Sequence, residues 1–167
     1  MPDDPRFRYW DACCITSYIN GYPDRLPDLD GILEEVRHSE GRVVLLTSTL
    51  SIVEVAFSIK EQQGRQLLPD EERRIDEMLA DTATIRLAEP HELIMKAARG
   101  LIREAMTAKL SLRAADAIHL ATAKHHQAIE FNTYDKKLLN PRYQGITGLV
   151  IQKPTAKEPS LGMVLPE

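Results

Sequence analysis

The sequence predicts an α/β domain of three layers, in which helices cover both faces of a mostly parallel sheet. Short runs rich in strand-forming residues alternate with longer segments that carry apolar side chains at helical spacing. The 167 residues are enough for one ordinary domain and too few for two of comfortable size. A single sheet covered by helices is therefore the simplest arrangement of these segments.

Five stretches have the length and composition of strands. RFRYW (6–10) and VVLL (43–46) are the clearest, and TIRLAE (84–89) and AIEFNT (128–133) are weaker candidates of the same kind. GLVIQ (148–152) is expected to form an edge strand, and the prolines that follow it discourage regular structure. We therefore place a single domain at residues 1–152 and a proline-containing tail at 153–167.

Helical patterns fill the intervals between these strands. One is expected over 29–39, a second follows the Ser/Thr cluster at 47–49, and a third begins at Pro69. A long segment follows Pro90, and LRAADAIHLATAKHH (112–126) is apolar on nearly every side. In the helix after 47–49, the predicted core-facing stripe is Leu50, Val53 and Phe57. In the segment after Pro90 it is Leu93, Ala97, Leu101 and Ala105.

Composition sets limits on the class of protein. Hydrophobic residues make up 43% and charged residues 28% of the chain, which favours a globular protein over a disordered one. No apolar run is long enough to span a membrane and the start lacks a signal-peptide pattern, so a cytoplasmic protein without a membrane partner is expected. The adjacent Cys13 and Cys14 are expected to be reduced, buried and structural, because neighbouring residues rarely satisfy disulfide geometry. No second pair of ligands accompanies them, so zinc is not expected.

The net charge of −4 does not exclude an anionic substrate such as a nucleic acid. A basic excess is the usual sign of phosphate binding. If four acidic residues form a metal site, however, the remaining 21 balance the 21 Lys and Arg. Bound cations would then offset the other four.

Four acidic residues occupy positions that require an explanation. Asp11 directly follows the first strand and Asp135 lies just beyond the fourth, whereas Glu54 and Asp116 interrupt apolar helical patterns. A buried carboxylate without compensation is unfavourable. Each acid also has an ordinary alternative: a helix N-cap for Asp11, Asp116 and Asp135, and a capping box with Ser51 for Glu54.

Considered together, the four acids favour a metal site over four separate caps. Ligands bind beyond the carboxyl ends of parallel strands, and clustered like charges oppose folding unless a cation joins them. An all-oxygen set of ligands suits Mg²⁺ or Mn²⁺. The predicted ligands are Asp11, Glu54, Asp116 and Asp135.

Four stretches resemble the PIN domain and, within it, the VapC-type toxins of bacterial toxin–antitoxin pairs. They are YWDACCITSYI, STLSIVEVAFS, LRAADAIHLATA and NTYDKKL, which together span about residues 9–138. LRAADAIHLATA followed by T-x-D at 133–135 is the most specific part. The resemblance implies metal binding by Asp11, Glu54, Asp116 and Asp135, with the hydroxyl of Thr133 helping to arrange them.

The chain departs from the family pattern beside the first acid. The next residue is often Asn, Ser or Thr in the family, but here it is Ala12. This leaves Asp11 without an adjacent hydroxyl or amide. The chain also exceeds a minimal toxin in length, with the extra residues assigned to 60–82 and the tail.

The resemblance implies a three-layer α/β/α PIN-like fold and a Mg²⁺- or Mn²⁺-dependent endoribonuclease, the toxin of a type II toxin–antitoxin system. Such an enzyme hydrolyses RNA phosphodiester bonds with a metal-activated water. The implied partners are RNA, a cognate antitoxin protein and a second copy of the chain in a homodimer. The alternative is a catalytically inactive PIN-like module that binds RNA or protein. A phosphoryl enzyme with Asp11 as nucleophile is disfavoured, because Cys13 stands where the D-x-D form of that chemistry has an acid.

Other residues near the four acids have a structural and a functional interpretation. We favour core packing for Trp10 and Tyr134 over stacking on a base, and a hydrogen-bonded core position for His119 over support of a metal ligand. Isolated basic residues on helices are usually solvated surface. Six basic residues are candidates for phosphate contacts, but for each of them we favour solvated surface: Arg99, Arg103, Lys109, Arg113, Lys136 and Lys137.

Overall fold

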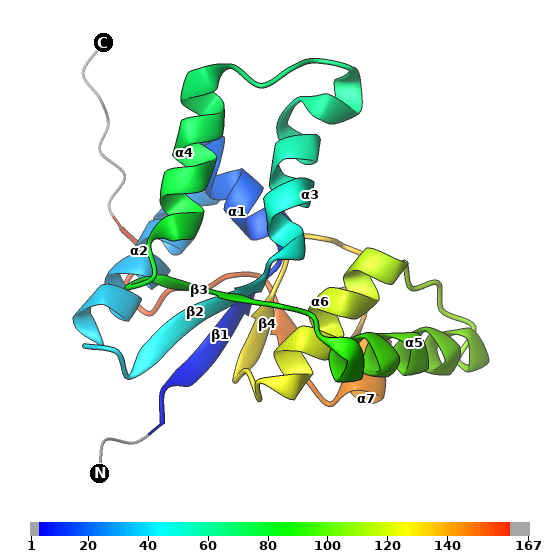
Figure 1. The fold of residues 1–167 in the computed structure, drawn as a ribbon. Coiled ribbons are helices and arrows are strands. Elements are labelled where there is room, and N and C mark those ends of the chain that lie inside the picture. Colours follow the sequence, from blue (N-terminus) through cyan, green and yellow to red (C-terminus); the bar gives the residue numbers. More distant parts are fainter. Residues whose placement is uncertain (1–3, 161–167) are drawn as a thin grey trace.

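The computed structural model describes residues 4–160 as a five-stranded sheet with helices on both faces (Figure 1). The strands are β1 (Arg6–Trp10), β2 (Val43–Ser48), β3 (Ile85–Ala88), β4 (Glu130–Asn132) and β5 (Ile151–Gln152). Their order in the sheet is β3-β2-β1-β4-β5, and every neighbouring pair is parallel. The α/β class and the parallel sheet predicted from the sequence are confirmed.

Seven α-helices form the two outer layers among residues 4–160 (Figure 1). One layer contains α1 (Ala12–Ile19), α2 (Leu26–His38), α3 (Leu50–Ile59) and α4 (Pro69–Ala80), with the short 3₁₀ helix η1 (Glu61–Gln63) between the last two. The other contains α5 (Glu92–Thr107), α6 (Ala114–His125) and α7 (Pro141–Thr147). In this part of the chain, no helix has the length and apolar character needed to cross a membrane.

Each face of the sheet has its own hydrophobic core, because successive side chains of a strand point to opposite faces. Tyr9 of β1 packs with Leu46 and Phe131 under α5 and α6. The next residue, Trp10, packs with Leu45 on the side of α1 and α2 and is almost fully buried. The predicted core position of Trp10 is therefore confirmed.

The order of the strands reverses between β1 and β4. From β1 the chain proceeds outward through β2 to β3, and it then crosses to β4 and β5 on the other side of β1. In open parallel sheets, ligand clefts form at such a reversal, beyond the carboxyl ends of the strands. β1 ends immediately before Asp11, and β4 ends immediately before Thr133. Two of the predicted site segments therefore lie at the reversal.

The apolar stripe predicted for α5 is only half correct. Leu101 and Ala105 are buried as expected, but Ile94 and Ala98 are the other buried positions, and Leu93 is exposed. Residues at constant steps of four drift by about 40° per step around a helix of 3.6 residues per turn. A stripe built only from such steps therefore rotates out of the core.

The stripe predicted for α3 is wrong for a different reason. Val53 is 66% exposed and Phe57 is 49% exposed, whereas Ser51 and Val55 are buried. The Ser51 hydroxyl lies 2.7 Å from the hydroxyl of Thr47 in β2, so a small polar side chain faces the sheet here. Val55 faces the core, whereas Ile52, Val53 and Phe57 lie on the outer surface of α3.

Residues 153–160 pack against α2, although they form no regular structure. The Ala156 N–H donates to the Asp28 carboxylate at 2.9 Å. The chain passes so close that a methyl group on Gly31 would lie 2.6 Å from both the Ala156 side chain and the Glu158 carbonyl oxygen. Residues 161–167 of the predicted tail lie outside the described part of the chain.

Replacing Gly31 by alanine should therefore destabilise the protein. The new methyl group would force the 153–160 segment away from α2, which we expect to lower the free energy of unfolding by about 1–3 kcal/mol. Gly100 in α5 is the matched control, because a methyl group there would have no neighbour within 4 Å. Gly100→Ala should raise the free energy of unfolding by up to ~1 kcal/mol through helix propensity. Urea unfolding of both variants measures this, and equal stability of Gly31→Ala and wild type would contradict the packing described.

Candidate active site

One cleft brings together the four acids that the sequence analysis singled out. Asp11, Glu54, Asp116 and Asp135 all line a cavity of about 500 Å³. They come from four separate segments: the junction of β1 and α1, the middle of α3, the first turn of α6 and the loop after β4. The cleft therefore joins elements from both helical layers at the carboxyl ends of the central strands.

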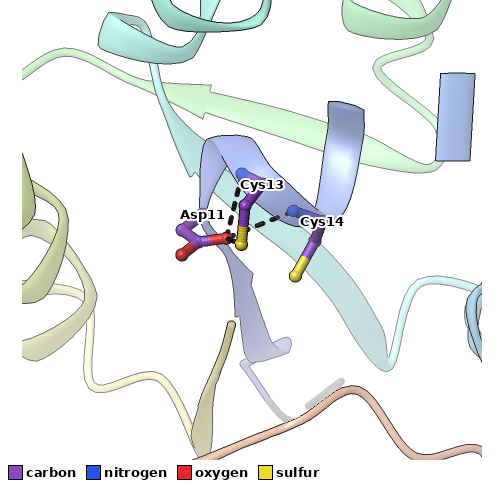
Figure 2. Close-up of side chains that lie close together, drawn as sticks. All are labelled: Asp11, Cys13 and Cys14. Carbon is purple, nitrogen blue, oxygen red and sulfur yellow. Dashed lines mark hydrogen bonds between the residues drawn. The ribbon is translucent and has the colours of Figure 1, made fainter. Parts of the chain in front are cut away.

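Asp11 caps helix α1, as Figure 2 shows. Its Oδ1 atom accepts the backbone N–H groups of Cys13 at 3.1 Å and Cys14 at 3.2 Å. Asp11 is only 7% exposed. Burial raises the pKa of its carboxyl, and hydrogen bonds from Cys13 and Thr133 oppose that rise. The N-cap alternative is thus correct for Asp11, and the capping carboxyl also borders the cleft.

The thiol of Cys13 supports Asp11 as well. Its Sγ donates to Asp11 Oδ1 at 2.7 Å (Figure 2), accepts the Tyr134 N–H at 3.1 Å, and lies 3.5 Å from the Thr133 hydroxyl. Cys13 thereby connects the start of α1 to the loop after β4. The expectation that Ala12 leaves Asp11 unsupported is therefore wrong, because the donor comes from the following residue.

Asp11, Cys13 and Cys14 are the one trio of metal-ligating residues in 4–160 whose ligand atoms all lie within 4.8 Å of one another. Cys14 does not suit a thiolate site, because its Sγ donates to the Asn132 carbonyl at 3.3 Å and burial raises the pKa of its thiol. Both cysteines are free thiols, as predicted. Cys14 is buried, as predicted, but the burial predicted for Cys13 is wrong, because Cys13 is partly exposed and lines the cleft.

Glu54 lies in the middle of α3 and contacts α6. The helix begins at Leu50, so the capping box with Ser51 is wrong. His119 Nε2 is 2.5 Å from Glu54 Oε2, and His119 Nδ1 is 2.7 Å from the hydroxyl of Tyr9. The hydrogen-bonded core position predicted for His119 is confirmed, and its contact with Glu54 is the feature that the sequence analysis undervalued. The sequence does place His119 one helical turn after Asp116, which indicates that it lies near the acidic residues.

Asp116 lies inside the first turn of α6, which begins at Ala114, so Asp116 is not the N-cap. Arg113 binds it through two nitrogens, at 3.0 and 3.3 Å, and also lies 3.5 Å from Asp135. The hydrogen bonds that Arg113 donates to Asp116 raise the pKa of Arg113. Lys137 lies 3.6 Å from the same carboxylate. The Arg113 side chain is largely exposed, as its interpretation as solvated surface implies, but its guanidinium also bridges two of the acids.

Asp135 is held in a turn rather than at the start of a helix. Its N–H donates to the Thr133 hydroxyl at 2.9 Å, and its Oδ1 accepts the Lys137 N–H at 2.8 Å. The helix cap proposed as its alternative is therefore wrong. Thr133 is fully buried, and its hydroxyl also forms a hydrogen bond that lowers the pKa of Asp11. Thr133 consequently contacts the first and the last acid of the group.

The set of donors in the cleft fits a hard divalent cation. Carboxylate oxygens from four residues face one space, and these are the ligands that Mg²⁺ and Mn²⁺ prefer. Within residues 4–160, no three of these acids have ligand atoms within 4.8 Å of one another. A single cation bound by three of them would therefore need to draw the carboxylates together. The Arg113 side chain is largely exposed, so it can swing away as this occurs.

Arg25 also lines the cleft, although no sequence motif points to it. It precedes α2, donates to the Ser17 hydroxyl at 2.7 Å, and lies 4.2 Å from the centre of the Tyr134 ring. Tyr134 is partly buried against the core beside α1, as predicted. Arg25 lies near the four acids only because of the tertiary fold, so its place in the cleft could not be predicted from the sequence.

The other basic candidates divide into two groups. Lys109, Lys136 and Lys137 line a hollow of about 260 Å³, and Lys137 also reaches Asp116. Arg99 and Arg103 are exposed on α5, in agreement with their interpretation as solvated surface. The three lysines therefore lie in a hollow that Lys137 connects to the acidic cleft.

Comparison with known proteins identifies the same fold in solved structures. One such structure is that of VapBC2 from Rickettsia felis bound to a DNA fragment from the VapBC2 promoter. Its matching chain is 14% identical to this protein with a TM-score of 0.67, and the match covers 88% of this chain and 98% of that chain. For VapBC-1 from nontypeable Haemophilus influenzae the identity is 21%, the TM-score 0.61 and the coverage 88% and 97%. For FitAcB from Neisseria gonorrhoeae these values are 17%, 0.60, 87% and 96%.

A comparison with curated proteins gave no match. The family model of the PIN domain, in contrast, matches residues 9–142. This segment runs from the last two residues of β1 through β4 and contains all four acids of the cleft. The chain belongs to the PIN domain family.

Proposed function

We propose that this protein is a metal-dependent endoribonuclease and the toxin of a type II toxin–antitoxin pair. The observation that carries the proposal is the convergence of four carboxylates in one cleft of a PIN domain, at the reversal of strand order. A divalent cation bound there supplies Lewis-acid activation of water and neutralises charge on the phosphoryl oxygens.

The residues of the cleft then have distinct roles. Asp11, Glu54 and Asp116 would hold the main cation, and Asp135 would hold a second cation or orient water. Thr133 arranges two of these acids through its hydroxyl, because it accepts the Asp135 N–H and forms a hydrogen bond with Asp11. No side chain is required as a covalent nucleophile.

The electrostatics of Asp11 support a cation in the cleft. Its carboxyl is buried, and that burial raises its pKa, so the charged form is unfavourable in the folded protein. The residues that support Asp11 are neutral donors: two backbone N–H groups, a thiol and a hydroxyl. A bound cation would favour the ionised carboxylate that these groups already orient.

Basic side chains beside the cleft support RNA as the substrate. Arg25 and Arg113 line the cleft itself, and Lys137, Lys136 and Lys109 continue from it along the adjoining hollow. Such side chains bind phosphates irrespective of base sequence, as a nuclease requires for the backbone around the scissile bond.

The proposed partners are a cognate antitoxin and a second copy of the chain. The solved structures that share this fold are of VapBC and FitAcB assemblies, which supports a protein partner of the antitoxin type. The exposed apolar side chains of α3, Ile52, Val53 and Phe57, support a homodimer, because such residues are usually covered when they lie together.

The alternative is a PIN-like module that binds RNA or protein without cleaving it. The presence of all four acids, each held by at least one hydrogen bond, weighs against the loss of catalysis. RNA cleavage separates the two functions directly.

Asp116→Asn should abolish cleavage and leave the fold intact. The amide keeps the shape of the side chain but removes a charge from the proposed metal site, so we expect the rate to fall on the order of 10²-fold or more. The assay is digestion of mixed RNA with Mg²⁺ or Mn²⁺, with EDTA as the metal-free control. Asp70→Asn in α4, where the side chain is exposed, is the matched control and should cleave normally. An unchanged rate in folded Asp116→Asn would refute the role of this acid.

Asp11→Asn should stabilise the protein in the absence of divalent cations. Asparagine keeps the capping oxygen and removes a buried charge, so the melting temperature at pH 7.5 should rise by about 2–4 °C. Because the folded-state pKa of Asp11 is raised, the wild-type carboxyl gains a proton more readily in the folded state as pH falls. The wild type therefore regains stability on acidification, and the difference between the two proteins should shrink. A lower melting temperature for Asp11→Asn, or a difference independent of pH, would contradict this account.

Val53→Glu should convert a homodimer into a monomer. A charge on the exposed apolar surface of α3 would oppose burial between two copies. Sedimentation velocity measures the state, with Val150→Glu as the control because Val150 is also half-exposed but distant from α3 in the sequence and lies before β5. Dimers of unchanged stability in Val53→Glu would exclude α3 as the interface.

A further inference from the structure

A buried chain of hydrogen bonds connects the sheet to the acidic cleft. The Tyr9 hydroxyl of β1 lies 2.7 Å from His119 Nδ1 in α6, and His119 Nε2 lies 2.5 Å from Glu54 Oε2 in α3. This series of hydrogen bonds runs from the centre of the molecule to a carboxylate that borders the cleft. Figure 1 shows that α6 and α3 belong to opposite layers, so these three side chains join both layers and the sheet.

The two inner members of this chain are rigidly placed. Tyr9 is fully buried, and His119 is almost fully buried. The Tyr9 ring stacks on the Phe131 ring, with centres 5.1 Å apart and planes 9° from parallel. The Tyr9 and His119 rings pack edge to face. The imidazole is therefore fixed by packing as well as by its hydrogen bonds.

The hydrogen bonds can run in one direction, from Tyr9 through His119 to Glu54. A tyrosine hydroxyl carries its proton at neutral pH, so Tyr9 can donate to His119 Nδ1 at 2.7 Å. His119 Nε2 then carries the N–H that faces Glu54 Oε2. A neutral imidazole in this tautomer satisfies both of its neighbours.

Glu54 depends on this support more than the other acids depend on theirs. Asp11 is held by two backbone N–H groups and a thiol, Asp116 by two nitrogens of Arg113, and Asp135 by a backbone N–H and by Arg113. Among residues 4–160, the one side-chain hydrogen bond that reaches Glu54 comes from His119. Glu54 also has the longest side chain of the four and the most rotatable bonds to restrain. Without the imidazole, its carboxylate would sample several directions.

We propose that His119 and Tyr9 are positioning residues that hold Glu54 in the orientation needed to bind the cation. The inference rests on the proposed function, because it assigns Glu54 to the metal site. His119 would hold one carboxylate oxygen and leave the other directed at the cleft. Outer hydrogen-bond partners of this kind typically change metal affinity by about 10–100-fold when they are removed.

Two substitutions of His119 separate positioning from simple core packing. The amide nitrogen of glutamine can take the place of Nε2 and donate to Glu54, whereas the shorter asparagine can reach only the place of Nδ1 beside Tyr9. Both replacements are neutral and polar, so they disturb the core to a similar degree. Only His119→Gln keeps the hydrogen bond that the proposal requires.

The test is Mn²⁺ binding by the full chain without RNA, measured by electron paramagnetic resonance of free Mn²⁺. His119→Asn should weaken binding by about 10–100-fold, and His119→Gln should restore most of the wild-type affinity. Tyr9→Phe removes one hydroxyl and should produce a smaller loss. In RNA cleavage, the Mn²⁺ concentration for half-maximal rate should rise in His119→Asn, and the rate at saturating Mn²⁺ should largely recover.

Thr122→Val controls for general damage to α6, because the Thr122 hydroxyl donates to the Ile118 carbonyl of the same helix. It should leave Mn²⁺ affinity unchanged. Equal Mn²⁺ affinity in wild type, His119→Asn and Tyr9→Phe would overturn the positioning role, as would equal losses in His119→Gln and His119→Asn. If Asp116→Asn abolishes binding in that same experiment, the proposed metal site stands and only the positioning role fails. If the wild type itself binds no Mn²⁺, the metal site and the positioning role are both refuted.

Discussion

Four carboxylates meet beyond the carboxyl ends of β1 and β4, and their mutual repulsion has to be offset before the chain can fold. Each acid receives a different kind of support. Asp11 has the N–H groups at the start of α1, Glu54 has an imidazole, Asp116 has a guanidinium, and Asp135 has a backbone N–H in the turn after Thr133. The architecture is what brings these supports together, because they originate in the sheet and in both helical layers.

Reversal of strand order is the reason that a cleft exists at this place. Helices α1 and α3 leave β1 and β2 on one face, while the chain reaches β4 through α6 on the other face. The cleft lies where these paths diverge, so two acids from each path can face it. Arg113 bridges two of the acids and lies at the mouth of the cleft, where it is exposed. A cation or a phosphate could therefore compete with it, and the same residue can serve the free and the occupied site.

Much of this arrangement could be predicted from the sequence, because strands and their ends depend on local patterns. RFRYW predicted β1 at its exact bounds, and the acids beyond β1 and β4 followed from the parallel topology. Contacts between distant segments could not be predicted. Nothing in the pattern of α3 indicated that Val53 would face outward, or that Arg25 would reach the cleft. His119 was placed correctly in the core, but its value depends on Glu54, 65 residues earlier in the chain.

The position of bound Mn²⁺ tests the central claim most directly. Crystals of the protein grown with Mn²⁺ should show an anomalous scattering peak inside the cleft, within bonding distance of carboxylate oxygens of Asp11 and Asp116. We expect Arg113 to have moved away from the bridge between Asp116 and Asp135 in that structure. A peak bound to the thiols of Cys13 and Cys14, or a cleft without Mn²⁺ in which Arg113 still joins the two acids, would contradict the account.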